Sequence, residues 1–353
     1  METNIDISTI NKYFSLNKEK QTDTIKQLRT KIVNYSHFSI NEANISHNIS
    51  KIPYYSNFFS ILDDYEELNI SQLNENIIEK LNNTEGMKYY LFKYSDRNST
   101  DFIDFLYNSA SIKKLILDII NSFQHLLYGL HLLNENNICF FDISPKNIIF
   151  LENYREKPVI RNFKFSLQLN KLNYTYFSHI LNKLEDFTYQ PFEIHILFYF
   201  VKHHMVTISY EFIEEFCDNF VENLDILRLF TENYKKTYKD QCVETMRKYI
   251  NLPRKQIIDD IFERNNKWDV YGISMIFLQI FGCISRVFSL KGTFISKITL
   301  ELSKNLHPNS DKRMTLEETL NNFNKLLNQE EDWKFVNKLD NSKLEQLFDE
   351  FGK

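Results

Sequence analysis

The stretch Cys139-Phe140-Phe141-Asp142-Ile143-Ser144-Pro145-Lys146-Asn147-Ile148-Ile149-Phe150 decides the fold of this chain. Two apolar runs flank a polar hexad that contains a proline, so the pattern predicts a strand, a loop and a second strand. An aspartate and an asparagine lie five positions apart in the hexad. In one loop Asp142 can orient a hydroxyl group while Asn147 offers an oxygen to Mg²⁺. The hexad is therefore the first candidate for chemistry.

The segments around the hexad predict an α+β protein. Apolar residues recur at steps of three and four between Leu115 and Leu133, so a long amphipathic helix is expected over about 112–134. Upstream, residues 87–94 predict a buried strand, and residues 54–70 predict a β-hairpin around an acidic turn. From about residue 175 helical periodicity dominates. The chain is expected to have a small β-rich part followed by a larger helical part.

Asp142 and Asn147 in this setting resemble the catalytic loop of the eukaryotic protein kinases, which reads H-R-D-x-x-x-x-N. The helix before the loop is similar to the αE helix of that family, and four further segments match in the same order. They are Asn41-Glu42 with the strand after it (αC helix), Gln190-Pro191-Phe192-Glu193 (A-P-E), Lys267-Trp268-Asp269-Val270-Tyr271-Gly272 (start of αF) and His307-Pro308-Asn309-Ser310-Asp311-Lys312-Arg313.

The resemblance implies a two-lobed protein-kinase-like fold, with a small β-rich N-lobe and a larger helical C-lobe. It places a reduced N-lobe at 1–92, a C-lobe at 93–325 and a helical C-terminal extension at 326–353. Glu193 and Asp269 are 76 positions apart, where the family has about a dozen, so a helical insertion is expected at about 205–265. The insertion is expected to be extra scaffold, with a partner-docking subdomain as the alternative.

The resemblance also implies roles for individual residues. Asp142 would be the catalytic residue that accepts or orients the proton of a substrate hydroxyl, and Asn147 would be a metal ligand. Asp269, at the start of a buried helix, would accept hydrogen bonds from the loop backbone. Glu193 and Arg313 would form a buried ion pair that braces the helical lobe.

A nucleotide site is implied by three further matches. Phe92, Lys93 and Tyr94 lie in LFKY, which resembles the hinge strand, and Lys146 places a charge in the catalytic loop. Glu42 would pair with a lysine of the small lobe. Lys26, 16 positions earlier, is the expected partner and Lys31 is its rival.

Departures from the family pattern bear on activity. Where D-F-G is expected the chain reads Asn162-Phe163-Lys164, so the metal ligand would be the uncharged Asn162. A carboxamide lacks the negative charge that Mg²⁺ favours. Phe140-Phe141 replaces H-R, so an arginine that reads phosphorylation is missing from this position. The chain has six glycines, and none of them forms a phosphate-cradling cluster.

Three functions therefore stay open. The first is ATP-dependent phosphoryl transfer to a protein Ser/Thr or Tyr hydroxyl, with ATP and Mg²⁺ or Mn²⁺ as cofactors. The second is a pseudokinase that binds a protein partner and has little or no activity. The third is a small-molecule phosphotransferase, which the matches at 267–273 and 307–315 oppose because they are protein-kinase features.

Composition excludes other classes. The 42 basic and 47 acidic residues are interspersed and give a net charge of −5, so neither a nucleic-acid footprint nor a polybasic membrane anchor is expected. The polar start and the lack of a run of eighteen apolar residues predict no signal peptide and no membrane span. Four separated cysteines indicate reduced thiols and an intracellular, cytoplasmic protein.

Overall fold

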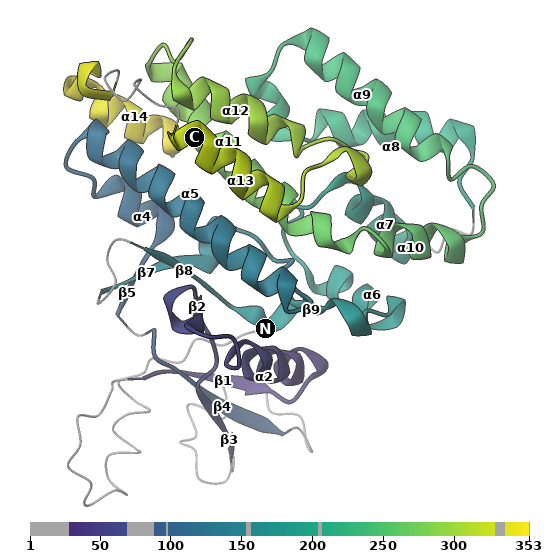
Figure 1. The fold of residues 1–353 in the computed structure, drawn as a ribbon. Helices are drawn as coiled ribbons and strands as arrows, with labels where there is room; N and C mark the ends of the chain where they lie inside the picture. Colours follow the sequence, from purple (N-terminus) through teal and green to yellow (C-terminus); the bar gives the residue numbers. More distant parts are fainter. Residues whose placement is uncertain are drawn as a thin grey trace, which may run out of the picture. The chain divides into compact units, whose positions relative to one another are not determined.

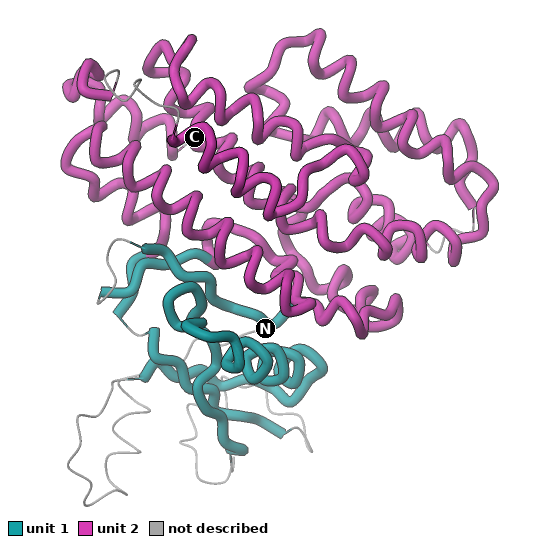
Figure 2. The backbone as a smooth tube through the Cα atoms, in the orientation of Figure 1, with its two compact units in different colours: residues 1–100, 148–166 teal, residues 101–147, 167–353 magenta. Residues whose placement is uncertain are grey.

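The computed structural model describes residues 28–68, 88–96, 98–152, 157–203, 207–328 and 336–352. The chain divides into two compact units, coloured teal and magenta in Figure 2. Unit 1 comprises Met1–Thr100 and Ile148–Ser166, and unit 2 comprises Asp101–Asn147 and Leu167–Lys353. The segment that follows the hexad at 142–147 thus belongs to unit 1, together with the N-terminal strands. Lys26 lies outside the described residues.

Unit 1 contains two sheets (Figure 1). Strands β1 (Arg29–Asn34), β4 (Tyr89–Tyr94) and β3 (Asp64–Leu68) form an antiparallel sheet in the order β1-β4-β3. The second sheet has the order β2-β8-β7-β5, with bounds Phe59–Ser60, Pro158–Arg161, Ile148–Leu151 and Ser99–Asp101. The buried strand expected at 87–94 is confirmed as β4.

The β-hairpin expected over 54–70 is wrong. Strand β2 pairs in parallel with β8, whereas β3 pairs with β4. The two strands are neighbours in sequence but join different sheets, because each finds a longer partner elsewhere in unit 1. A short acidic turn between apolar runs therefore misled the sequence-based expectation.

Helix α2 (His37–Ile49) begins at a well-formed cap. Ser36 is extended, and its side chain accepts a hydrogen bond from the backbone N–H of Ser39, while the Ser39 side chain accepts one from the N–H of Ser36. This capping box satisfies two backbone donors that the first turn would leave unpaired. The buried face of α2 includes Glu42, Ile45 and Ile49, so one carboxylate enters the interior of unit 1.

Unit 2 is built around two long helices. The expected helix at 112–134 is confirmed as α5 (Ile112–Glu135), which Ser111 caps. Helix α11 (Trp268–Val287) is buried over most of its length. The ring of Phe123 on α5 lies 4.7 Å from that of Phe277 on α11 and 4.8 Å from that of Phe323 on α13 (Leu316–Asn328). These aromatic contacts join the three helices, which run side by side in Figure 1.

Shorter elements complete unit 2, and the region expected to be helical from about 175 onward is helical. The hexad at 142–147 lies after β6 (Ile138–Cys139), which pairs with β9 (Leu167–Gln168), and ends in the 3-10 turn η3 (Pro145–Asn147). The remaining elements are α4 (Phe102–Tyr107), α6 (Tyr174–Lys183), α7 (Phe192–His203), α8 (Tyr210–Glu222), η7 (Asp225–Leu229), α9 (Glu232–Arg247), α10 (Arg254–Phe262), α12 (Phe294–Lys304) and α14 (Leu344–Phe351).

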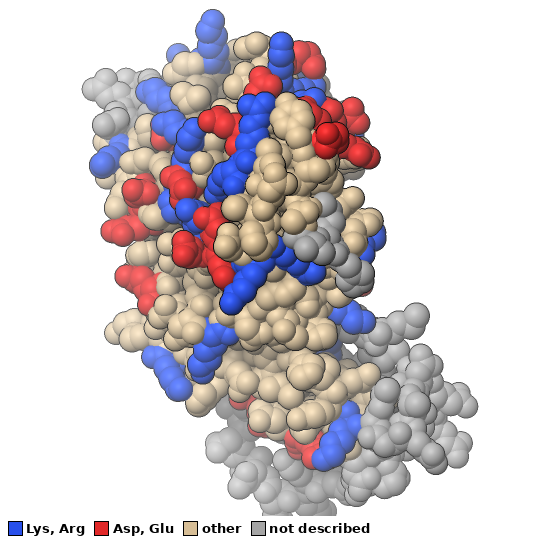
Figure 3. All heavy atoms as spheres, turned by 90° about the vertical axis from the view of Figure 1, so that its right-hand side faces the viewer, with Lys and Arg blue, Asp and Glu red and all other residues tan. Residues whose placement is uncertain are grey.

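Within the described residues, one segment is long and apolar enough to cross a membrane. It is Asn265–Val287, with a mean hydropathy of 1.6, and 78% of its most apolar window is buried inside the fold. Burial of this kind is typical of a core helix. On the face drawn in Figure 3, basic and acidic side chains are interspersed.

Candidate active site

The hexad of unit 2 forms a closed loop in which Asn147 contacts Asp142. The Nδ2 of Asn147 donates to the Asp142 backbone oxygen at 2.8 Å and to its Oδ2 at 3.1 Å. The backbone N–H of Asn147 also donates to the carbonyl of Ser144 at 3.0 Å. Asn147 is buried and Asp142 is half-buried. The two side chains singled out by sequence are therefore held together. The side chain of Lys146 is exposed.

Asp269, the second residue of α11, fixes the backbone just before the hexad. Its carboxylate accepts the N–H of Phe140 at 2.7 Å and the N–H of Phe141 at 2.8 Å, and the Sγ of Cys139 lies 3.3 Å from Oδ1. Burial raises the pKa of Asp269, although these donors work in the opposite direction. The structure thus brings the second residue of a core helix to the base of the loop.

Phe141 adopts a conformation that is unfavourable for a bulky residue. Its φ is 66°, in the left-handed region, so its backbone holds strain. The Nε2 of Gln190, which is buried, donates to the Phe141 carbonyl at 2.8 Å. The Phe141 ring lies 5.3 Å from that of Phe177 and 5.8 Å from that of Trp268. Hydrogen bonds at both backbone ends and aromatic packing together stabilise the strained residue.

Gly272 on α11 lets the loop lie close to the core helix. A Cβ at this position would lie 3.1 Å from the Cβ of Ile143 and 3.1 Å from the carbonyl oxygen of Tyr189. Such distances are tighter than most Cβ contacts, so a larger residue would require Ile143 or the backbone at Tyr189 to shift by a few tenths of an ångström. The glycine of the segment 267–273 thus has a structural reason in this fold.

Glu193 at the start of α7 and Arg313 form a buried ion pair. The guanidinium donates to both carboxylate oxygens, at 2.8 Å and 2.6 Å, and its Nε donates to the carbonyl of His307 at 2.7 Å. The cation also lies over the ring of Tyr271, 5.1 Å from its centroid. Burial opposes the charge of Arg313, yet the carboxylate of Glu193 raises the pKa of the guanidinium above its usual range.

In unit 1, Asn162 lies immediately before the 3-10 turn η5 (Phe163–Phe165) with φ 69° and ψ 69°. Asparagine tolerates this left-handed conformation better than most residues. Helix α2 holds the turn, because the Nδ2 of Asn41 donates to the carbonyls of Lys164 at 3.1 Å and Ser166 at 2.8 Å. The ring of Phe163 is buried and lies 6.0 Å from that of Phe59. The segment that stands where D-F-G is expected is thus fixed to the helix that carries Glu42.

Glu42 of α2 contacts Tyr94, whose hydroxyl donates to its Oε1 at 2.8 Å. Burial and the neighbouring Glu42 carboxylate raise the pKa of Tyr94. Arg29 of β1 lies 4.2 Å from the Tyr94 ring centroid and donates to both oxygens of the buried Asp96, at 2.6 Å and 3.0 Å. The described residues around Glu42 therefore include an arginine–aspartate pair. Lys26 lies outside them, and Lys31 lies on β1 opposite Phe92.

The expected hinge residues Phe92, Lys93 and Tyr94 lie at the end of strand β4. Phe92 and Tyr94 are buried in a hydrophobic cluster of unit 1 that also contains Leu62. Lys93 pairs with Asp64 at 3.1 Å. The backbone of β4 is paired with β1 on one edge and with β3 on the other. The backbone of this strand is therefore paired on both sides within the sheet, and a nucleotide-binding role of residues 92–94 stays a prediction.

The expected metal ligands lack negative charge. Asn147 belongs to unit 2 and Asn162 belongs to unit 1, and both side chains are carboxamides. Within the described residues no group of three or more His, Cys, Asp or Glu is placed to hold a metal ion. Mg²⁺ prefers carboxylates and phosphate oxygens. Each expected ligand is an uncharged carboxamide, which holds this ion more weakly than a carboxylate would.

Sequence reasoning missed four polar residues that hold the site segments. Arg29, Asn41, Asp96 and Gln190 all contact backbone or side chains far away in sequence. Gln190 immediately precedes Pro191 in the segment that was matched, and Asn41 precedes Glu42, so both lay inside quoted motifs. No local pattern marks Arg29 or Asp96, because their partner is 67 positions away.

No family model and no curated protein matches the chain. Among solved structures, the chain is similar to the autoinhibited serine kinase domain of the giant muscle protein titin, with a TM-score of 0.41 and 14% sequence identity. The similarity covers 89% of this chain and 74% of the titin chain.

Proposed function

We propose that this protein is a protein-kinase-like phosphotransferase that moves the γ-phosphoryl group of ATP to a protein hydroxyl. One observation carries the proposal. Asn147 holds the carboxylate of Asp142, while Asp269 fixes the two residues before it through their backbone N–H groups. A carboxylate held by such a network is preorganised to orient a substrate hydroxyl.

The chemistry assigned to Asp142 is proton management. As the substrate oxygen forms its bond to phosphorus, the bond from phosphorus to the bridging oxygen of ATP breaks and ADP leaves. The hydroxyl proton passes to the carboxylate of Asp142. When bound, Mg²⁺ or Mn²⁺ would neutralise phosphate charge, with Asn147 as the ligand that unit 2 offers.

The test is phosphate transfer from labelled ATP to a generic protein acceptor by the full chain. Asp142→Ala is expected to lower the rate by about 10²–10⁴-fold, the usual contribution of a general base. Asp259→Ala is the matched control, because Asp259 is an exposed aspartate on α10. Equal activity of wild type and Asp142→Ala would exclude the catalytic role of Asp142.

A second function, a pseudokinase that binds a protein partner, is favoured by a separate observation. Asn162 stands at the position where a charged metal ligand is expected, and Glu42 accepts a hydrogen bond from Tyr94. Thermal unfolding with ATP, in the presence and absence of Mg²⁺ or Mn²⁺, separates the two. A stabilised wild type supports nucleotide binding, and a gain of transfer in Asn162→Asp identifies the missing carboxylate. If ATP neither stabilises the wild-type protein nor donates phosphate, only the function of binding a protein partner remains.

A further inference from the structure

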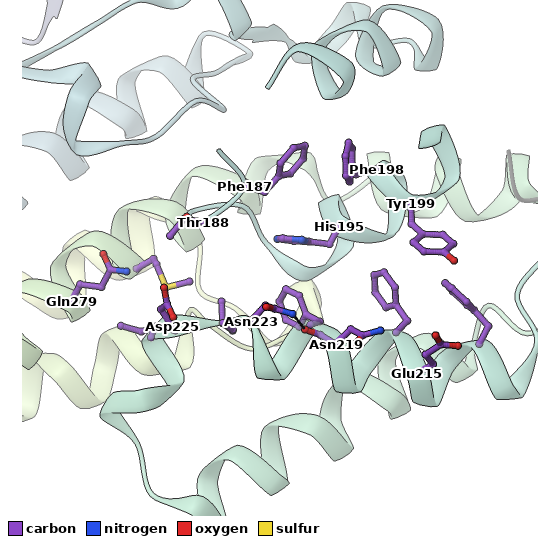
Figure 4. A pocket seen from close by; sticks show the side chains of 16 residues that line it. Phe187, Thr188, His195, Phe198, Tyr199, Glu215, Asn219, Asn223, Asp225 and Gln279 are labelled. Carbon is purple, nitrogen blue, oxygen red and sulfur yellow. Dashed lines mark hydrogen bonds between the residues drawn. The ribbon is translucent and has the colours of Figure 1, made fainter. Parts of the chain in front are cut away.

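A pocket of about 430 Å³ lies within unit 2, away from the catalytic-loop hexad (Figure 4). Its walls come from the loop before α7, from α7 and α8, from the chain that follows α8 into η7, and from α11. Its volume lies in the range of small-molecule sites. The phosphoryl-transfer proposal assigns no role to this pocket.

Aromatic rings form most of the apolar wall. They are Phe187, Phe198, Tyr199, Phe212, Phe216 and Phe220. The rings contact one another, with centroids 4.4 Å apart for Phe187 and Phe198 and 4.8 Å apart for Tyr199 and Phe212. Faces of aromatic rings carry partial negative charge and attract cations. The wall therefore suits an apolar body and tolerates positive charge.

The charged groups that line the pocket are carboxylates. Glu215 and Asp225 are both in the lining, which contains no lysine or arginine. Asp225 pairs with Arg228 at 2.9 Å at an exposed position, so that contact is screened by solvent. Glu215, on α8, has no ion pair with the described residues. The residues that line the pocket therefore carry a net negative charge.

His195 adds no positive charge to the wall. Burial lowers the pKa of His195 to about 4, against the opposing effect of the neighbouring backbone of Gln190 and Phe187. The ring is therefore neutral near pH 7, and its buried Nε2 has no hydrogen-bond partner within the described residues. Figure 4 shows the ring reaching from α7 toward the space bounded by Phe187, Thr188 and Asn223.

We propose that this pocket binds a small organic cation, an amine with an aromatic or aliphatic body. The aromatic wall takes up the body, and Glu215 together with the ring faces stabilises the ammonium group. Anionic compounds of the same shape are expected to bind more weakly, because Glu215 in the lining has no ion pair with the described residues and the lining holds no lysine or arginine.

Three probes of one shape test the proposal on the full chain at pH 7: 4-phenylbutylamine, 4-phenylbutanol and 4-phenylbutyrate. Isothermal titration calorimetry is expected to show the amine binding about fivefold more tightly than the alcohol, with the carboxylate weakest. Glu215→Gln is expected to weaken the amine about threefold and leave the alcohol unchanged. Glu222→Gln, an exposed glutamate of the same helix outside the lining, is the matched control.

A bulky substitution that fills the pocket provides a second test of the proposal. Asn219 is an exposed lining residue of α8, so Asn219→Trp is expected to abolish amine binding while thermal unfolding stays that of wild type. The proposal is overturned if the alcohol or the carboxylate binds as tightly as the amine. It is equally overturned if no probe binds at millimolar concentration, or if folded Asn219→Trp binds the amine normally.

Discussion

Arg313 donates to both carboxylate oxygens of Glu193, 120 positions away in the chain, and neither side chain is more than 8% exposed. The contact joins the start of α7 to the segment between α12 and α13. Two parallel N–H···O bonds give such a pair a defined geometry as well as energy. The pair therefore fixes the register of helices that are distant in sequence.

Removing one partner of this pair is expected to be strongly destabilising. Glu193→Gln should lower the free energy of unfolding by about 3–5 kcal/mol, because Arg313 is left as an uncompensated buried charge. Urea unfolding of the single variants and of the Glu193→Gln/Arg313→Met double variant measures the coupling. A double variant that is no more stable than the worse single variant would contradict this account.

Asp269→Asn is expected to lower the free energy of unfolding by about 2–3 kcal/mol. The carboxamide replaces one acceptor oxygen by a donor, so a backbone N–H of Phe140 or Phe141 loses its partner. Activity, if present, should fall with it, because the loop that carries Asp142 loses its anchor. Urea unfolding and phosphate transfer are the measurements. Asp259→Asn is the surface control, and an equal effect of both substitutions would refute the anchoring role.

Tyr94→Phe is expected to destabilise unit 1 by about 1–3 kcal/mol, since Glu42 loses a hydrogen bond inside the fold. Tyr65→Phe is the matched control. Tyr65 lies on β3 of the same sheet and is 53% exposed, so loss of its hydroxyl should change stability by less than about 0.5 kcal/mol. Hydrogen exchange of the β1 and β4 amides measures the effect locally. Equal protection in the two variants would show that the Tyr94–Glu42 bond contributes little.

Acidification is expected to weaken the fold through His307. Burial, with the charges of Lys312 and Arg313, lowers the pKa of His307 to about 4, and the N–H of Asn309 donates to its Nδ1 at 3.0 Å. The unfolded chain takes up this proton near pH 6.5 and the folded chain only near 4. The stabilisation is therefore complete above about pH 6.5 and is lost as the pH falls toward 4.

Urea unfolding at pH 7, 6 and 5 tests this dependence in wild type and His307→Asn. In wild type, His307 is expected to make the free energy of unfolding fall by at most about 1 kcal/mol per pH unit between pH 6.5 and 4. The variant should lack this contribution below pH 6.5. His195 contributes in the same direction in both proteins, because its pKa is also lowered to about 4. Identical slopes in the two proteins would exclude His307 as a source.

Local patterns predicted the regular elements well and the long-range contacts poorly. The period of three to four residues in α5 and the apolar run in β4 were readable because one element produces each pattern. Strand β2 was misjudged because its partner β8 lies about one hundred positions later. Among the site residues, Arg29 and Asp96 could not be paired from sequence. They lie 67 positions apart, and the chain offers 42 basic and 47 acidic residues as alternative partners.

The packing of Phe141 determines how the loop at 141–147 responds to the ionic strength of the solution. A loop held by an arginine and a phosphate would loosen as salt rises, because exposed charges lose their attraction beyond about 3 Å in 1 M salt. Phe141 is held by aromatic rings and by buried hydrogen bonds. The loop should therefore keep its shape across a wide range of ionic strength. A phosphate group added elsewhere on this chain would find no charge at Phe141 with which to form an ion pair.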